Sequence, residues 1–134
     1  MQPKLAVTGY RGIWGESLTT EIAVKYAQAF GIFVKDCHKS DLWPTILIGR
    51  DGRESGQAIL EAIIPELEKL DINVINGDIL PTPTIIFAVQ KHKYDGAIII
   101  TASHNPIEYN GIKFVTKDAR MTNEEDVEKI KKYL

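Results

Sequence analysis

The sequence predicts an α/β fold: a three-layer α/β/α domain built on a mixed, mainly parallel sheet of about four strands. Short apolar runs alternate along the chain with longer segments that have apolar residues at helical spacing. Two of the runs, Thr45–Gly49 and Ala97–Thr101, are apolar almost throughout, which is typical of strands buried on both faces. The segment Ala102–Gly111 is too short for a crossover helix, so the last strand can run antiparallel. An all-parallel sheet is the alternative.

The first part of the chain is predicted to form two strands and a helix. Leu5–Val7 is expected to be a short strand, and the glycine-containing segment Gly9–Gly15 is expected to be a turn. Thr19 can cap the following helix. The apolar face of that helix is formed by Ile22, Ala23, Tyr26, Ala27 and Phe30. Thr45–Gly49 then gives the second strand.

The middle of the chain is predicted to form two helices with a strand between them. The apolar face of the first helix contains Ile59, Leu60, Ile63, Ile64, Leu67 and Leu70. Pro65 lies within this helix and removes one backbone hydrogen bond, so we expect a bend or a break near Ile64. Ile72–Ile75 is expected to be a strand. Thr82 and Pro83 supply a cap and a first-turn proline for the second, shorter helix.

The last part of the chain is predicted to form two strands and a helix. Ala97–Thr101 and Ile112–Val115 are the expected strands. Thr122 and Glu125 have the spacing of a capping box that begins a final helix. The apolar stripe of this helix continues to Leu134, the last residue. Such an ending suggests a chain cut from a longer protein, and a natural terminus is the alternative.

Length and composition are those of one globular domain, residues 1–134. With 16 basic and 18 acidic residues and no basic tract, a nucleic-acid partner is not expected. No apolar stretch approaches the ~20 residues of a membrane span, and Met1–Lys4 resembles no secretory signal. We therefore expect no membrane association and a cytoplasmic location. Cys37 is the only cysteine, which excludes an internal disulfide.

The most informative segment is Thr101–Pro106, which reads Thr-Ala-Ser-His-Asn-Pro. It follows an apolar strand, and ligands of open α/β sheets bind at the carboxyl ends of the strands. The Asn-Pro pair favours a turn, so Ser103 is expected to be held at a bend. Asn110–Lys113 follows closely and returns a lysine toward the same region.

A serine beside a histidine also raises the possibility of a serine hydrolase. Adjacent side chains of an extended segment point in opposite directions, so His104 is poorly placed to take the proton of Ser103. The Gly-x-Ser-x-Gly sequence of α/β hydrolases is also missing around Ser103. His38 and His92 have no motif that would make either one the base. A covalent carrier that an incoming substrate activates fits the segment better.

These segments resemble the α-D-phosphohexomutases, the family of phosphoglucomutase and phosphomannomutase. Thr101–Pro106 together with Asn110–Lys113 is similar to the family's phosphoserine loop. Leu5–Gly12 is similar to its opening loop, Phe-Gly-Thr-Ser-Gly-Ile-Arg-Gly, although the residues before the first matching glycine differ. Arg50–Gly56 and Pro81–Pro83 are also similar to family segments. The resemblance covers the whole chain, but only the first of the family's four domains.

The resemblance implies a function in which phosphorylated Ser103 donates its phosphoryl group to a sugar phosphate. A bisphosphorylated sugar forms, turns over and returns its other phosphate to Ser103, so hexose 1-phosphate and hexose 6-phosphate interconvert. Arg11, His104 and Lys113 become the catalytic candidates, which balance phosphate charge or move a proton. Each has a simpler alternative: Arg11 could bond loop carbonyls, His104 could belong to the turn, and Lys113 could be a solvated strand residue.

The same resemblance implies the cofactors and partners. Ser103 would contribute to a Mg²⁺ site through its phosphate, and the remaining ligands would come from an Asp-rich loop of a second domain. A hexose 1,6-bisphosphate would be the phosphorylating activator. The partners are the sugar phosphate and the remaining domains of the parent enzyme, without which this chain is expected to be nearly inactive.

Two further questions stay open at the level of sequence. A non-catalytic module that binds sugar phosphates or other anions is the alternative function. The residue before Ala102 in the loop, Thr101, favours the phosphoglucomutase and phosphomannomutase branch slightly over phosphoglucosamine mutases.

Asp51 and Arg53 are expected to form a structural turn or an internal ion pair.

Overall fold

The computed structural model describes residues 4–134, so the expectation based on Met1–Lys4 lies almost wholly outside the described residues. Within these described residues, nine elements follow one another. They are β1 (Tyr10–Ile13), α1 (Thr20–Cys37), β2 (Thr45–Arg50), α2 (Ser55–Glu68), β3 (Asn73–Ile79), α3 (Thr82–His92), β4 (Gly96–Ile100), β5 (Tyr109–Thr116) and α4 (Glu124–Lys131). No helix of the described part is both long and apolar enough to cross a membrane.

The strands form one mixed sheet in the order β1-β5-β4-β2-β3. β5 pairs antiparallel with both β1 and β4, whereas β2 pairs parallel with both β4 and β3. Only β5 therefore runs against the other strands, and the predicted mixed, mainly parallel sheet is confirmed. The sheet has five strands instead of the predicted four or so, and its first strand is the N-terminal glycine-containing segment that pairs with β5.

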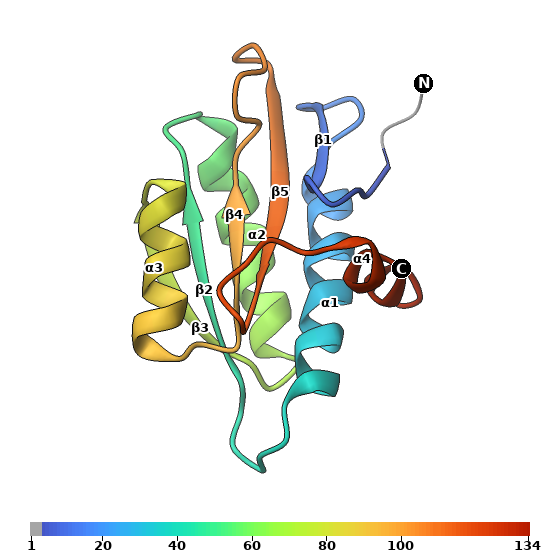
Figure 1. Ribbon diagram of the computed structural model, residues 1–134. Helices are drawn as coiled ribbons and strands as arrows, with labels where there is room; N and C mark the ends of the chain where they lie inside the picture. The colour runs from blue at the N-terminus through green and yellow to red at the C-terminus, as the bar shows by residue number, and fades with distance from the viewer. Residues whose placement is uncertain (1–3) are drawn as a thin grey trace.

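Helices cover both faces of the sheet, as the three-layer prediction requires (Figure 1). Buried residues of α1, α2 and α4 pack on one face, and those of α3 pack on the other. Phe30 of α1 stacks on Phe114 of β5 with 4.4 Å between the ring centroids. Because each face is sealed by apolar packing, the polar chemistry is confined to the ends of the strands.

The predicted first strand at Leu5–Val7 is wrong. Ala6 makes only an isolated bridge to Gly9, where the backbone has a φ of 92°. The chain turns there and enters β1, whose Tyr10 lies opposite Ile112 of β5. A Cβ on Gly9 would lie 2.2 Å from the carbonyl oxygen of Ile112, so glycine permits the close approach of the two strands.

Two predicted features of the helices also differ from the structure. α2 continues through Pro65 to Glu68, so of the expected bend or break near Ile64 the break does not occur in this described helix. Pro65 is exposed and lies in the last turn, where a missing backbone bond affects only a short remainder of the helix. The capping box of α4 lies one residue later than predicted, at Asn123 and Asp126.

The loops that matter for function gather at one end of the sheet. Figure 1 shows the β4–β5 loop, the β2–α2 loop and the loop after β1 at the same end of the molecule. The reason is directional: β1, β2 and β4 all end there, and β5 begins there. Ligands of open α/β sheets bind at this end of the strands.

Candidate functional site

Ser103 lies at the bend of the β4–β5 loop, with its side chain exposed. Its φ is 54°, in the left-handed region that a residue with a side chain seldom adopts. Such a conformation costs roughly 1–3 kcal/mol and persists only where the surroundings enforce it. The Ser103 amide donates to Thr101 Oγ1 at 3.0 Å, and the Thr101 hydroxyl donates to Asp51 Oδ2 at 2.7 Å. These hydrogen bonds fix the backbone at Ser103, and its hydroxyl faces solvent.

Lys113 reaches Ser103 from the neighbouring strand β5. Its Nζ donates to Ser103 Oγ at 2.7 Å, so the loop and the returning strand meet as the sequence predicts. Burial, and secondarily the charge of Arg11, lower the pKa of Lys113 below its ordinary value. The ammonium is thus partly desolvated and lies near a second cation. An added anion would reduce the repulsion between the two cations.

Arg11 projects from β1, where it lies opposite Gly111 of β5. One terminal nitrogen donates to Asn105 Oδ1 at 3.2 Å. Its Nε is buried and has no hydrogen-bond partner within residues 4–134. Arg11 therefore joins the loop through a side-chain amide and does not bond loop carbonyls, the simpler role considered above. It still has N–H groups free for another acceptor.

His104 is exposed beside Ser103. No hydrogen bond links its ring to Ser103 in the part of the chain that the structure describes, so the pair is not a preformed nucleophile and base. The two other histidines lie at the opposite end of the sheet. His38 is half-buried and contacts Asp95 at 3.1 Å, just before β4 begins, and His92 stacks on Tyr94. Neither can serve Ser103 as the base of a hydrolase.

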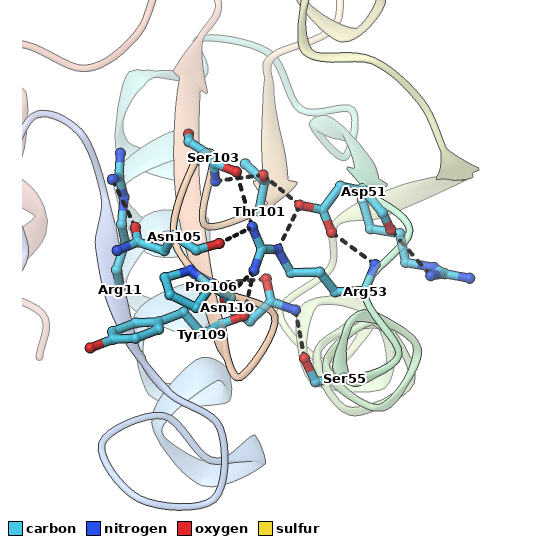
Figure 2. A network of polar contacts seen from close by, with 12 residues as sticks. Arg11, Asp51, Arg53, Ser55, Thr101, Ser103, Asn105, Pro106, Tyr109 and Asn110 are labelled. Atoms are coloured by element: carbon cyan, nitrogen blue, oxygen red, sulfur yellow. Dashed lines mark hydrogen bonds and ion pairs between the residues drawn. The ribbon is translucent and has the colours of Figure 1, made fainter.

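Arg53 is buried, and Figure 2 shows its guanidinium in contact with the loop. Its Nε donates to Asp51 Oδ2 at 3.1 Å, which is the predicted internal ion pair. Its terminal nitrogens donate to four carbonyls of the loop, those of Ser103, Asn105, Pro106 and Tyr109. The sequence reasoning recognised the ion pair but missed these loop contacts.

A signal for the Arg53 contacts was present in the sequence. Asp51 and Arg53 directly follow one apolar strand, and Thr101–Pro106 directly follows another. Two polar segments at the carboxyl ends of parallel strands meet if the strands are neighbours. The sequence did not indicate that β2 and β4 are adjacent. Buried Asn110 supports the same region, since its side chain donates to Ser55 Oγ at 2.8 Å.

The described residues do not assemble a metal site by themselves. Within 4–134 there is no group of three His, Cys, Asp or Glu side chains that could hold a metal ion. Ser103 is exposed and its Oγ accepts from Lys113, and a phosphate on this oxygen would add three acceptor oxygens. Phosphohexomutases generally use Mg²⁺, and such oxygens are the ligands that Mg²⁺ prefers.

Comparison with characterised proteins gives consistent results. A phosphoglucosamine mutase from Pediococcus pentosaceus is 39% identical over 117 residues, which cover 87% of this chain and 26% of that protein. A phosphoglucomutase/phosphomannomutase from Thermococcus kodakarensis is 43% identical over 107 residues, covering 80% of the chain and 23% of that protein. The chain thus spans about a quarter of the length of the curated relatives it matches.

Similarity extends to solved structures. A crystal structure from Thermus thermophilus, described as a candidate phosphomannomutase, superposes with a TM-score of 0.88 at 25% identity. The alignment covers 99% of this chain and 30% of that one. Residues 3–134 also match the family model described as "Phosphoglucomutase/phosphomannomutase, alpha/beta/alpha domain I". The resemblance inferred from the loop motifs is therefore confirmed, and the chain belongs to the phosphoglucomutase/phosphomannomutase family.

Proposed function

We propose that this chain is the phosphoserine-bearing first domain of a phosphohexomutase, with Ser103 as the phosphoryl carrier. The observation that carries the proposal is the exposed Ser103 hydroxyl at 2.7 Å from the Lys113 ammonium. Phosphoryl transfer depends mainly on positioning and on neutralising the charge of the phosphate oxygens. A serine at a hydrogen-bonded bend, with Lys113 on its hydroxyl and Arg11 bonded to Asn105 of the same loop, meets both requirements.

The proposed transfer exchanges one phosphorus–oxygen bond for another. A hydroxyl oxygen of the sugar phosphate attacks the phosphorus on Ser103, and the bond from phosphorus to Oγ breaks. The hydroxyl proton passes to a base, for which His104 is the candidate, while the departing Oγ takes a proton from Lys113. A sugar bisphosphate results. After it turns over, the reverse steps return its other phosphate to Ser103, so the phosphoryl group moves from one hydroxyl of the sugar to another.

The two cations have separate parts in this proposal. Lys113 contacts the oxygen that gains charge when the phosphoryl group leaves, so its contribution is greatest in the transition state. Arg11 has N–H groups free to bond phosphate oxygens. Ser103 would hold Mg²⁺ through its phosphate, and oxygen ligands from a second domain would complete the site. When bound, Mg²⁺ neutralises part of the phosphate charge.

The proposed substrate is a hexose phosphate or a hexosamine phosphate, in line with the names of the relatives. Those names include both phosphoglucosamine mutase and phosphoglucomutase/phosphomannomutase. Because the chain spans only 26% of the first of these relatives, groups that recognise the sugar are proposed to lie in other domains. The chain alone is then expected to be nearly inactive, and mutase turnover of ~1 to 10³ per second by the 134-residue chain would contradict this.

The carrier role can be tested by mapping phosphate. The complete parent protein is incubated with a hexose 1,6-bisphosphate, digested and analysed by mass spectrometry. We expect phosphate on Ser103, and none in the same peptide of the Ser103→Ala protein. A bare Ser103 in a protein that still binds the bisphosphate would instead support the alternative, a non-catalytic module that binds sugar phosphates.

A further inference from the structure

The side chain of Arg53 has used all of its hydrogen-bonding capacity. A guanidinium carries five N–H donors in a fixed planar arrangement and has no acceptor. Here Nε donates to Asp51 at 3.1 Å. Nη1 donates to the carbonyls of Pro106 and Tyr109 at 2.6 and 3.1 Å, and Nη2 donates to those of Ser103 and Asn105 at 2.9 and 3.0 Å. No donor is left for a substrate phosphate.

These contacts hold the backbone of the serine from both sides (Figure 2). The carbonyl of Ser103 accepts from Arg53 Nη2, and the amide of Ser103 donates to Thr101 Oγ1 at 3.0 Å. Asp51 links the two supports, because its Oδ2 accepts both from Thr101 Oγ1 at 2.7 Å and from Arg53 Nε. The Thr101 hydroxyl proton is thereby directed to Asp51, which leaves its oxygen free to accept the serine amide.

We propose that Asp51, Arg53 and Thr101 act together as a positioning clamp, which holds Ser103 in its left-handed conformation so that Oγ faces Lys113. This inference rests on the proposed function of Ser103. It adds three positioning residues to the site, and none of the three is assigned a contact with phosphate or sugar. Without the clamp, Ser103 would relax to a negative φ, because that region is favoured for residues with a side chain. The hydroxyl would then turn away from the lysine at 2.7 Å.

The clamp is expected to affect turnover and not substrate binding. Arg53 has no free donor and Thr101 is buried, so we expect neither to bind sugar or phosphate and KM to stay close to that of the wild type. The rate constant of phosphoryl transfer depends steeply on geometry, and a displacement of about 1 Å can cost about 10²-fold. A residue needed only for folding would instead lower the amount of folded protein and leave the kcat of the folded fraction unchanged.

Thr101→Val is the sharpest variant, because valine has the shape of threonine but cannot bond Asp51 or the Ser103 amide. In the complete parent enzyme we expect kcat to fall by about 10- to 10²-fold, the effect of the two lost hydrogen bonds, with KM unchanged. Thr101→Ser keeps the hydroxyl and should restore kcat. The Ser103 amide hydrogen should exchange faster in the valine variant than in the wild type, and the Thr101→Ser variant should exchange at the wild-type rate.

Arg53→Ala tests the other half of the clamp. We expect kcat to fall by about 10²-fold, and added guanidinium ion to recover part of the lost rate by occupying the space that the side chain leaves. Arg120→Ala is the matched control, since Arg120 pairs with Asp126 near α4, far from the loop. Added guanidinium should not raise its kcat. If Arg53→Ala does not fold, the Thr101 pair decides the question.

The outcomes for the clamp and for the carrier are distinguishable. An unlabelled Ser103 in the wild-type enzyme, treated with a hexose 1,6-bisphosphate, overturns the carrier role, and with it the catalytic purpose of the clamp. A labelled wild type combined with a Thr101→Val enzyme of unchanged kcat overturns the clamp alone. Unchanged exchange of the Ser103 amide in the valine variant also overturns it, whereas faster exchange with a lower kcat supports it.

Discussion

The loop that carries Ser103 is contacted by cationic side chains on two sides. The cations on the two sides differ in how many of their N–H groups are already hydrogen-bonded within the protein. Beneath the loop, Arg53 is buried, paired with Asp51 and bonded to four backbone carbonyls. At the serine hydroxyl, Lys113 donates to one side-chain oxygen and Arg11 to another. Neither of these two has a carboxylate partner among the ion pairs of the described residues.

The comparison teaches that the role of a cation follows from its unused donors and from its unbalanced charge. Arg53 is neutralised and saturated, so it can only shape the loop. Lys113 and Arg11 keep spare donors and repel each other, which lowers the pKa of the lysine further after burial has lowered it. A phosphate placed between them would remove that repulsion, and the same phosphate would gain nothing from Arg53.

The largest expected effect is on stability, at Arg53. Arg53→Ala leaves Asp51 without its partner and four carbonyls without a donor. The Asp51 side chain is one-third exposed, so the cost comes mainly from the five hydrogen bonds that are lost, each of which contributes about 0.5–1.5 kcal/mol. The free energy of unfolding of the chain should therefore fall by about 3–5 kcal/mol in urea titrations. Arg53→Lys should recover little, because an ammonium cannot reproduce the planar guanidinium. A loss below about 1 kcal/mol would contradict the structural role of Arg53 that distinguishes it from Lys113 and Arg11.

The next effect is on catalysis, at Lys113. Removal of a preorganised donor that stabilises transition-state charge costs about 2.7–4 kcal/mol, so Lys113→Ala in the complete parent enzyme should lower kcat by about 10²–10³-fold. The folded fraction, followed by circular dichroism, should not fall. An unchanged kcat would return Lys113 to the role of a solvated strand residue.

A smaller effect concerns the backbone of Ser103. Its φ of 54° suits glycine better than any residue with a Cβ. Ser103→Gly and Ser103→Ala both lose the hydroxyl and its bond to Lys113, but only glycine relieves the strain. We expect the glycine variant to be more stable than the alanine variant by about 1 kcal/mol in thermal unfolding. Equal melting temperatures would mean that the loop imposes no strain at this residue.

The smallest effect is the pH dependence that Lys113 brings. Its pKa is lowered in the folded chain by burial and then by Arg11, so at neutral pH its charge costs stability. As the pH rises from the folded pKa toward the ordinary lysine value, the unfolded chain binds more protons than the folded chain, and stability increases. Lys113→Met should therefore raise the free energy of unfolding at pH 7 by less than about 1 kcal/mol, since solvent screens a half-exposed lysine. This gain should shrink as the pH approaches 10, and a gain independent of pH would assign it to packing.

Much of the site followed from simple rules of position. Ser103 follows a buried strand, and Lys113 lies on the strand that returns after a loop too short for a helix. Such a hairpin brings its two strands side by side, so the meeting of the two side chains was predicted and is observed at 2.7 Å. The cap of α1 at Thr19 was predicted for the same kind of local reason, and its side chain accepts from Ile22.

The strand β1 and the loop contacts of Arg53 were missed because they depend on partners distant in sequence. β1 contains an arginine and a glycine among its four residues, so its strand character comes from pairing with β5 and not from local apolarity. Thr122 with Glu125 and Asn123 with Asp126 both fit a capping box. The second pair forms because the Thr122 amide bonds the Phe114 carbonyl of β5 and Arg120 pairs with Asp126.

Local sequence by itself determined the order of helices and strands, the mixed sheet and the serine loop with its returning lysine, since apolar periodicity and loop length act over a few residues. Only the tertiary structure decided that β2 lies beside β4, which brings the guanidinium of Arg53 under a loop that follows it by about fifty residues. The physical reason is that the five N–H groups of Arg53 can bond their acceptors only when the ends of β2 and β4 lie side by side. The left-handed Ser103 is a product of that meeting.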